Sequence, residues 1–101
     1  MQRVVWKGER MDAKMDLAGH REELKPFSAL SKSFAEGAIY EHYKGKRYKI
    51  LAVSRHSESL DECVVYQAQY GNRDVWVRPV AMFSETIEIE GRVVPRFKRV
   101  E

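Results

Sequence analysis

The sequence feature that most constrains the fold is a series of short segments after Gly37 in which apolar and aromatic residues occupy every second position. This period is typical of β-strands, because alternate side chains point to opposite faces of a sheet. Turn residues separate the segments: Lys44-Gly45-Lys46 predicts one tight turn, and Gly71 begins a second. Such a chain is restricted to small antiparallel sheets or barrels.

The predicted strands are Ile39–Tyr43, Arg47–Arg55, Glu62–Tyr70, Val75–Val77, Thr86–Ile89 and Arg96–Val100. Pro79 ends the fourth segment because proline cannot donate a hydrogen bond to a sheet, and Val80–Phe83 is predicted as one helical turn. About five strands with one helical turn before the last pair is the order of a small SH3-like antiparallel barrel. We therefore predict a mainly β fold.

Arg47–Arg55 is predicted as a central strand because both of its faces carry apolar side chains. Strict alternation places Tyr48, Ile50 and Ala52 on one face. It places Leu51 and Val53 on the other.

Residues 1–36 form a segment of different character. Asp12–Leu24 has apolar residues at helical spacing, and Phe27, Leu30 and Phe34 recur at i, i+3 and i+7 after Pro26. One or two short helices are predicted, with a flexible tail as the alternative. The chain therefore divides into an N-terminal extension over residues 1–36, partly helical or flexible, and an SH3-like β-barrel domain over residues 37–101.

Length and charge limit the function classes. A chain of 101 residues has room for one domain with one modest core. The net charge of +3 allows an anionic partner but is well below that of strongly basic nucleic-acid binders. The single cysteine, Cys63, excludes an internal disulfide and is expected to be a small buried side chain. Without a leader or a long apolar run, the chain is expected to be cytoplasmic with no membrane partner.

A series of short motifs gives the chain a family resemblance. In order they are Gly37, Tyr40, His42-Tyr43-Lys44-Gly45, Tyr48, Arg55-His56-Ser57-Glu58, Val64-Val65-Tyr66, Tyr70-Gly71, Trp76-Val77-Arg78-Pro79, Met82-Phe83, Gly91 and Pro95-Arg96-Phe97. Over residues 37–99 the chain thereby resembles the bacterial domain-of-unknown-function family 1653. The resemblance implies an SH3-like barrel and no particular activity, and residues 1–36 lie outside it.

The first candidate site is the cluster Arg55, His56 and Glu58, at the end of a predicted strand, where binding groups are often presented. His56 could exchange a proton near neutral pH with Glu58 orienting its ring, as in a small hydrolase or modifying enzyme. Alternatively, Ser57 and Glu58 cap a turn while Arg55 pairs with a carboxylate. No nucleophile with a base and an orienting group is recognisable nearby, so binding or structure is favoured over catalysis.

The second candidate is Arg78 beside Trp76. A guanidinium can bind a carboxylate or phosphate, or stack on an indole, whereas Trp76 itself is expected to lie in the core more often than at a ligand platform. The barrel segment has more aromatic residues than a small core absorbs, so some of them should reach the surface and line a groove. The whole set is Tyr40, Tyr43, Tyr48, Tyr66, Tyr70, Phe83 and Phe97. Basic residues between them are Lys44, Lys46, Arg47, Arg55 and Arg96.

The sequence thus predicts a non-catalytic binding module, a monomer or weak homodimer, whose partner is a protein or a nucleic acid. Its predicted binding residues are His42, Tyr43, Arg55, His56, Glu58, Tyr66, Trp76, Arg78 and Arg96. The nucleic-acid alternative uses the turn Lys44–Arg47 together with Arg55. No cofactor is predicted, and no metal either, because His20, His42, His56 and Cys63 lack the close spacing of ligands.

Overall fold

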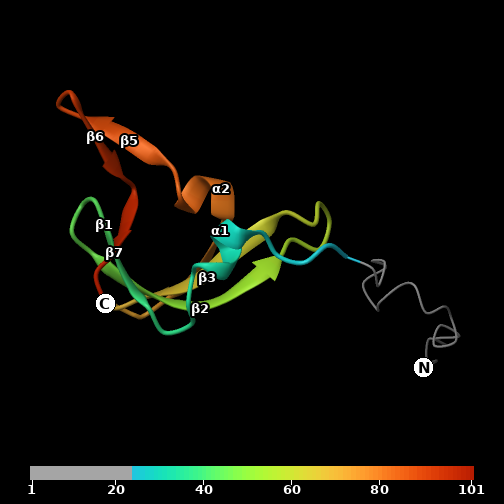
Figure 1. Ribbon diagram of the computed structural model, residues 1–101. Coiled ribbons are helices and arrows are strands. Elements are labelled where there is room, and N and C mark those ends of the chain that lie inside the picture. Colours follow the sequence, from blue (N-terminus) through green and yellow to red (C-terminus); the bar gives the residue numbers. More distant parts are fainter. Residues whose placement is uncertain (1–23) are drawn as a thin grey trace, which may run out of the picture.

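The computed structural model describes residues 24–101, which form antiparallel sheets and two short helices (Figure 1). In chain order the elements are α1 (Ala29–Lys32), β1 (Ile39–His42), β2 (Arg47–Arg55), β3 (Glu62–Ala68), β4 (Val75–Pro79), α2 (Val80–Phe83), β5 (Thr86–Ile89), β6 (Arg92–Pro95) and β7 (Phe97–Arg99). The prediction of a mainly β fold with a helical turn at Val80–Phe83 is confirmed. The predicted helix over Asp12–Leu24 lies, apart from Leu24, outside the described residues.

The strands are arranged in two sheets. The first has the order β4-β3-β2-β1-β7, and the second consists of β5 and β6 alone. All pairings are antiparallel, and β2 is central, as predicted. The described strands do not close into a barrel, because β5 and β6 pair with each other and leave β4 and β7 as the edges of the larger sheet. Figure 1 shows their hairpin projecting away from that sheet.

The sequence prediction lacks β6. Its four residues contain two adjacent valines and end at Pro95, so they show no alternation of apolar and polar side chains. Proline is tolerated there because β6 pairs only with β5 and has a free edge. The last strand, β7, pairs with β1.

A β-bulge corrects the predicted faces of β2. The register with β3 shifts between Ile50 and Ala52, so the alternation changes phase at Leu51. Val53 packs against the core beside Ile50, whereas Ala52 is exposed. Strict alternation predicted the reverse for these two residues, because a bulge leaves no mark in the apolar pattern.

The core lies on one face of the larger sheet, which we call the core face and which carries Ile50, Val64 and Tyr66. Both helices pack on this side (Figure 1). Phe83 of α2 is fully buried and stacks on Phe97 with ring centroids 4.0 Å apart and planes 6° apart. The ring of Phe34, just after α1, contacts the Phe83 ring edge-on, with centroids 5.3 Å apart. Cys63 is a buried free thiol whose pKa is raised by burial, as expected of a small core side chain.

The described part of the N-terminal segment is fastened to β3. Ser28 caps α1 and donates from its backbone N–H and its hydroxyl to the Glu62 carboxylate, and the buried Ser31 hydroxyl donates to the same group. These hydrogen bonds lower the pKa of Glu62. The predicted apolar spacing is right for Phe34 but wrong for Leu30, which is 47% exposed while Ser31 faces inward.

Within residues 24–101, neither helix has the length and apolar character needed to cross a membrane.

Candidate binding site

At the end of the sheet beyond α1, the core face carries a pocket of about 190 Å³ that we call the ring pocket. It is lined by His42, Tyr48, Tyr66, Tyr70, Trp76, Arg78 and Phe97. The sheet register brings these residues together: Tyr66 lies opposite Trp76, and His42 lies opposite Phe97. Because alternate side chains share a face, Arg78 projects on the same side as Trp76. The site is therefore built from all five strands of the larger sheet.

The phenol and phenyl rings form an interlocked wall. Tyr48 meets Tyr66 at 5.4 Å, Tyr70 at 5.5 Å and Phe97 at 5.7 Å between centroids, all edge-to-face. The hydroxyl oxygens of Tyr48 and Tyr70 are 2.5 Å apart in a hydrogen bond. Burial, followed by this hydrogen bond, raises the pKa of Tyr48 to about 12. Tyr48 is thus neutral at physiological pH, and its ring contacts hold the wall in one geometry.

Arg78 supplies the charge of the ring pocket. Its Nε donates to the Tyr66 hydroxyl at 3.2 Å, and its guanidinium carbon lies 5.8 Å from the centroid of the Phe97 ring. Arg47 and Arg96 form ion pairs with carboxylates, but Arg78 makes none with any residue that the structure describes. Within residues 24–101, its forked Nη groups meet no carboxylate, and their geometry suits an anionic group from outside.

His42 is a neutral imidazole between these cations. Burial, then the charges of Arg96, Lys44 and Arg78, lower the pKa of His42. Its Nδ1 accepts the backbone N–H of Lys44 at 3.2 Å, which leaves the proton on Nε2. The positive charges around His42 make this end of the sheet favourable for an anion.

Trp76 is at the open rim of the ring pocket. It is 52% exposed, so the expectation that it lies in the core is wrong. The reason is that β4 is an edge strand of the larger sheet and pairs, among the described strands, with β3 alone. Tyr70 and Tyr43 are also partly exposed, at 37% and 38%, which confirms that the core does not absorb all the aromatic residues.

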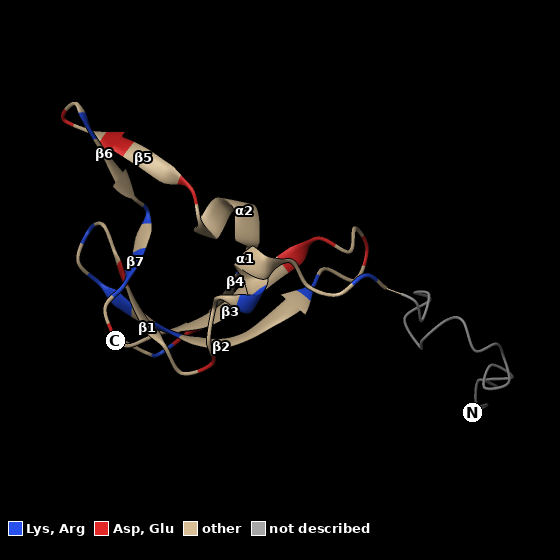
Figure 2. Ribbon diagram, viewed as in Figure 1, with Lys and Arg blue, Asp and Glu red and all other residues tan. Residues whose placement is uncertain are grey.

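Two lysines border the exposed rings. Gly45, with φ of +102°, turns the chain between β1 and β2 and places Lys44 and Lys46 on either side. The Lys46 Nζ lies 4.7 Å from the centroid of the Tyr70 ring, and the Lys44 Nζ lies 5.8 Å from that of Tyr43. Figure 2 shows Lys and Arg positions in blue along this turn and along β7.

A second, shallower groove adjoins the ring pocket beneath the β5–β6 hairpin. Its volume is about 370 Å³, and it is lined by Glu41, His42, Tyr43, Ile89, Val94, Pro95 and Lys98. His42 lines both, so the two are neighbours. Arg96 fixes the hairpin rather than facing a ligand: its Nε and Nη2 donate to Glu85 at 3.1 and 2.6 Å, which joins the two ends of the hairpin.

The candidate cluster of Arg55, His56 and Glu58 lies at the other end of β2 from the ring pocket. A strand of this length separates the two by up to about 26 Å. Arg55 stacks over Phe27 at 4.4 Å and donates to the Lys25 carbonyl. His56 Nδ1 accepts the backbone N–H groups of Glu58 and Ser59 at 3.0 and 3.3 Å. The imidazole therefore caps its own turn, and Glu58 meets it through its backbone.

The predicted site residues thus separate into groups. His42, Tyr66, Trp76 and Arg78 come together in the ring pocket, with Tyr43 and Arg96 beside it and Arg55, His56 and Glu58 elsewhere. The predicted binding residues omit Tyr48, Tyr70 and Phe97, which line the ring pocket too. All three are nevertheless among the aromatic residues from which the sequence predicts the lining of a groove. Among residues 24–101, no three His, Cys, Asp or Glu side chains gather as metal ligands would.

Comparisons with known proteins agree on one family. A family model described as a protein of unknown function, DUF1653, matches residues 38–99. The chain is also similar to the crystal structure of a DUF1653 protein from Bordetella bronchiseptica, with 30% identity and a TM-score of 0.62. That alignment covers 69% of this chain and 91% of the other. The curated proteins contain no match to the chain.

Proposed function

The chain belongs to the DUF1653 family of proteins of unknown function, and we propose that it acts as a non-catalytic binding module whose ring pocket receives one group of a macromolecular partner. The free and buried thiol of Cys63 is compatible with a reducing cytoplasm as the place of this binding.

The observation that carries the proposal is the Arg78 guanidinium, which has no carboxylate partner among the described residues and is set among aromatic rings. Keeping a cation partly out of water without a counter-charge costs free energy, and an anionic ligand would recover it. Arginine and the large aromatic residues are also the side chains that dominate binding energy at interfaces.

The size of the ring pocket favours a large partner over a free small molecule. Its volume of about 190 Å³ is below the roughly 300–1,000 Å³ of typical small-molecule sites. One ring or one side chain fills such a space. The rest of the ligand would then extend over the neighbouring groove beneath the β5–β6 hairpin, which shares His42 with the ring pocket.

The groups in the ring pocket do not favour catalysis. The pKa of Tyr48, raised to about 12, makes its phenol a poor proton donor at neutral pH. His42 has its Nδ1 occupied by the Lys44 N–H, so no carboxylate orients it there. The hydrolase alternative with His56 and Glu58 is also less favoured, because His56 Nδ1 is used to cap a turn.

Affinity capture from the cells that express the protein tests this proposal. The full chain, Arg78→Ala and Trp76→Ala are compared with Lys32→Ala, which removes a charge on α1 at the other end of the sheet. Both ring-pocket variants should lose a partner that the wild type and Lys32→Ala retain, with thermal unfolding showing that all four are folded. Equal capture by all four would disprove the role of the ring pocket.

A further inference from the structure

Building on the proposed function, we infer that the partner is a single-stranded nucleic acid: one base stacks on Trp76 and Tyr70 in the ring pocket, and neighbouring phosphates contact Arg78, Lys46 and Lys44.

The exposed rings are suited to stacking a base. Trp76 and Tyr70 are the ring-pocket side chains with large exposed fractions, at 52% and 37%. Tyr70 is anchored from behind by its hydrogen bond to Tyr48, so it loses little freedom when a ligand arrives. Aromatic platforms of this kind bind bases with little regard to sequence, because every base has a π-face.

Cations border the rings on more than one side, as contacts to the phosphates of a stacked strand would require. Lys46 lies against the Tyr70 ring on one side, and Arg78 hydrogen-bonds Tyr66 on another side of the ring pocket. The ring-pocket lining contains no carboxylate. Rings interleaved with cations in one groove are characteristic of single-strand binding.

Other anionic polymers would use this surface less completely. An acidic peptide could pair with Arg78 and the lysines, but its carboxylates would leave the faces of Trp76 and Tyr70 unused. A duplex keeps its bases stacked inside and presents only phosphates, so it too would leave the rings empty. Only an unpaired strand offers rings and phosphates together.

Fluorescence anisotropy of the full chain provides the test. The probes are labelled 12-nucleotide single strands of DNA and of RNA, a 12-base-pair DNA duplex and a 12-residue glutamate peptide. Either single strand should bind at least about tenfold more tightly than the duplex or the peptide. Affinity should fall with salt, with a slope of log K against log salt near −0.7 for each phosphate contacted.

Variants separate the ring contribution from the charge contribution. Trp76→Ala should weaken strand binding about tenfold without changing the salt slope, because stacking releases no ions. Arg78→Gln should make the slope shallower by about 0.7. The matched controls are Val93→Ala, an exposed apolar residue on β6, and Lys32→Gln, and both should stay within about twofold of the wild type.

Several results would overturn the inference: equal or tighter binding of the duplex, preference for the glutamate peptide, or strand binding that is indifferent to Trp76→Ala. Absence of strand binding, combined with loss of a captured partner in Arg78→Ala and Trp76→Ala, would reject nucleic acid and keep the binding module. Unchanged capture in those variants would reject the binding module itself. The two proposals therefore fail by different measurements.

Discussion

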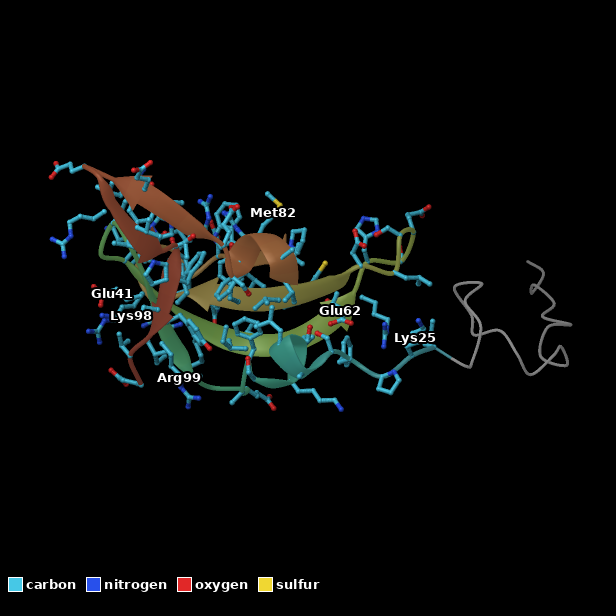
Figure 3. The ribbon with its side chains drawn as sticks, turned by 45° about the horizontal axis from the view of Figure 1, so that its top comes forward. Lys25, Glu41, Glu62, Met82, Lys98 and Arg99 are labelled. Atoms are coloured by element: carbon cyan, nitrogen blue, oxygen red, sulfur yellow. The ribbon has the colours of Figure 1, made fainter. Side chains whose placement is uncertain are left out.

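The segment around α1 and the ring pocket treat charged groups in opposite ways. At the first residue of β3, the Glu62 carboxylate accepts hydrogen bonds from Ser28 and Ser31. In the ring pocket, Arg78, which lies opposite Val64 in the strand register, has one neutral hydroxyl as its side-chain hydrogen-bond partner among the described residues. Figure 3 shows Glu62 beside α1, with Glu41 and Lys98 at the far end of the sheet.

This difference separates a structural contact, which holds α1 on β3, from the proposed binding site. Charged groups at the Glu62 end are satisfied from within the chain: Arg55, next to Glu62 in the strand register, stacks on Phe27. Over the ring pocket, α2 covers the sheet only in part: Phe83 packs on Tyr66 and Phe97, whereas Trp76 and Tyr70 stay exposed. In a small domain with little free energy to spare, a cation without a carboxylate partner among the described residues supports the binding role proposed above.

The largest effect on stability is expected at Phe83, which packs against both the α1 segment and the ring pocket. Phe83→Ala removes a fully buried ring that contacts Phe34 and Phe97, and it should cost about 3–5 kcal/mol of unfolding free energy. Urea denaturation followed by circular dichroism measures this loss. Met82→Ala, on the same helix but 48% exposed, is the control and should cost less than about 1 kcal/mol. Similar losses for both would mean that α2 is not the centre of the core.

A moderate effect is expected from the fastening at the Glu62 end. Ser28→Ala removes the N-cap of α1 and a donor to Glu62, and it should cost about 1 kcal/mol. Hydrogen exchange should show faster opening of residues 28–34, with the amides of β1 unchanged. A uniform increase in exchange over all strands would contradict the view of this contact as a local fastening. Ser33→Ala, a hydroxyl bonded within its own turn, is the matched control.

The strands and the helical turn could be predicted because local sequence determines them. Alternation, glycine turns and Pro79 gave β2 and α2 with the bounds that the structure has. The bulge at Leu51 and the strand β6 could not be predicted, since the first depends on register with β3 and the second on pairing across a hairpin. Pairing of the last strand with β1 likewise depends on the folded topology and not on local pattern.

The ring pocket was half predictable for a similar reason. Residue chemistry selected Trp76 and Arg78, and the excess of aromatic residues made Tyr48, Tyr70 and Phe97 candidates for a groove. Exposure could not be derived, because whether Trp76 is core or rim depends on which face the helices cover. Arg55 and Arg78 are both arginines in or near strand ends, and only the folded structure shows that the first stacks on Phe27 and donates to the Lys25 carbonyl, while the second lines the ring pocket beside Tyr66.

A smaller effect should come from exchanging these two arginines for methionine, which has similar reach but no charge. Arg55→Met loses a cation–π contact and should cost about 0.5–1 kcal/mol. Arg78→Met should change the unfolding free energy by less than about 0.5 kcal/mol, because removal of an uncompensated cation offsets the lost bond to Tyr66. Parallel urea titrations provide the measurement. A clear loss of stability in Arg78→Met would show that Arg78 stabilises the fold, and it would remove the contrast between the α1 segment and the ring pocket.

The smallest effect is expected in the pKa of His42, which responds to the positive charges around the ring pocket. Burial is the largest cause of its lowered pKa, and Arg96, Lys44 and Arg78 add to it, so Arg78→Gln should raise this pKa only part of the way toward 6.5. Since the folded pKa is lowered, His42 contributes stability above pH 6.5 that is lost as pH falls through the folded value. NMR titration of the imidazole Cε1 proton, assigned by its absence in His42→Gln, measures the shift. Lys32→Gln should leave the His42 pKa where it is, because α1 lies at the other end of the sheet. A His42 pKa that does not respond to Arg78→Gln would mean that the Arg78 charge is already neutralised by solvent, and the ring pocket would then offer an anion much less than the geometry implies.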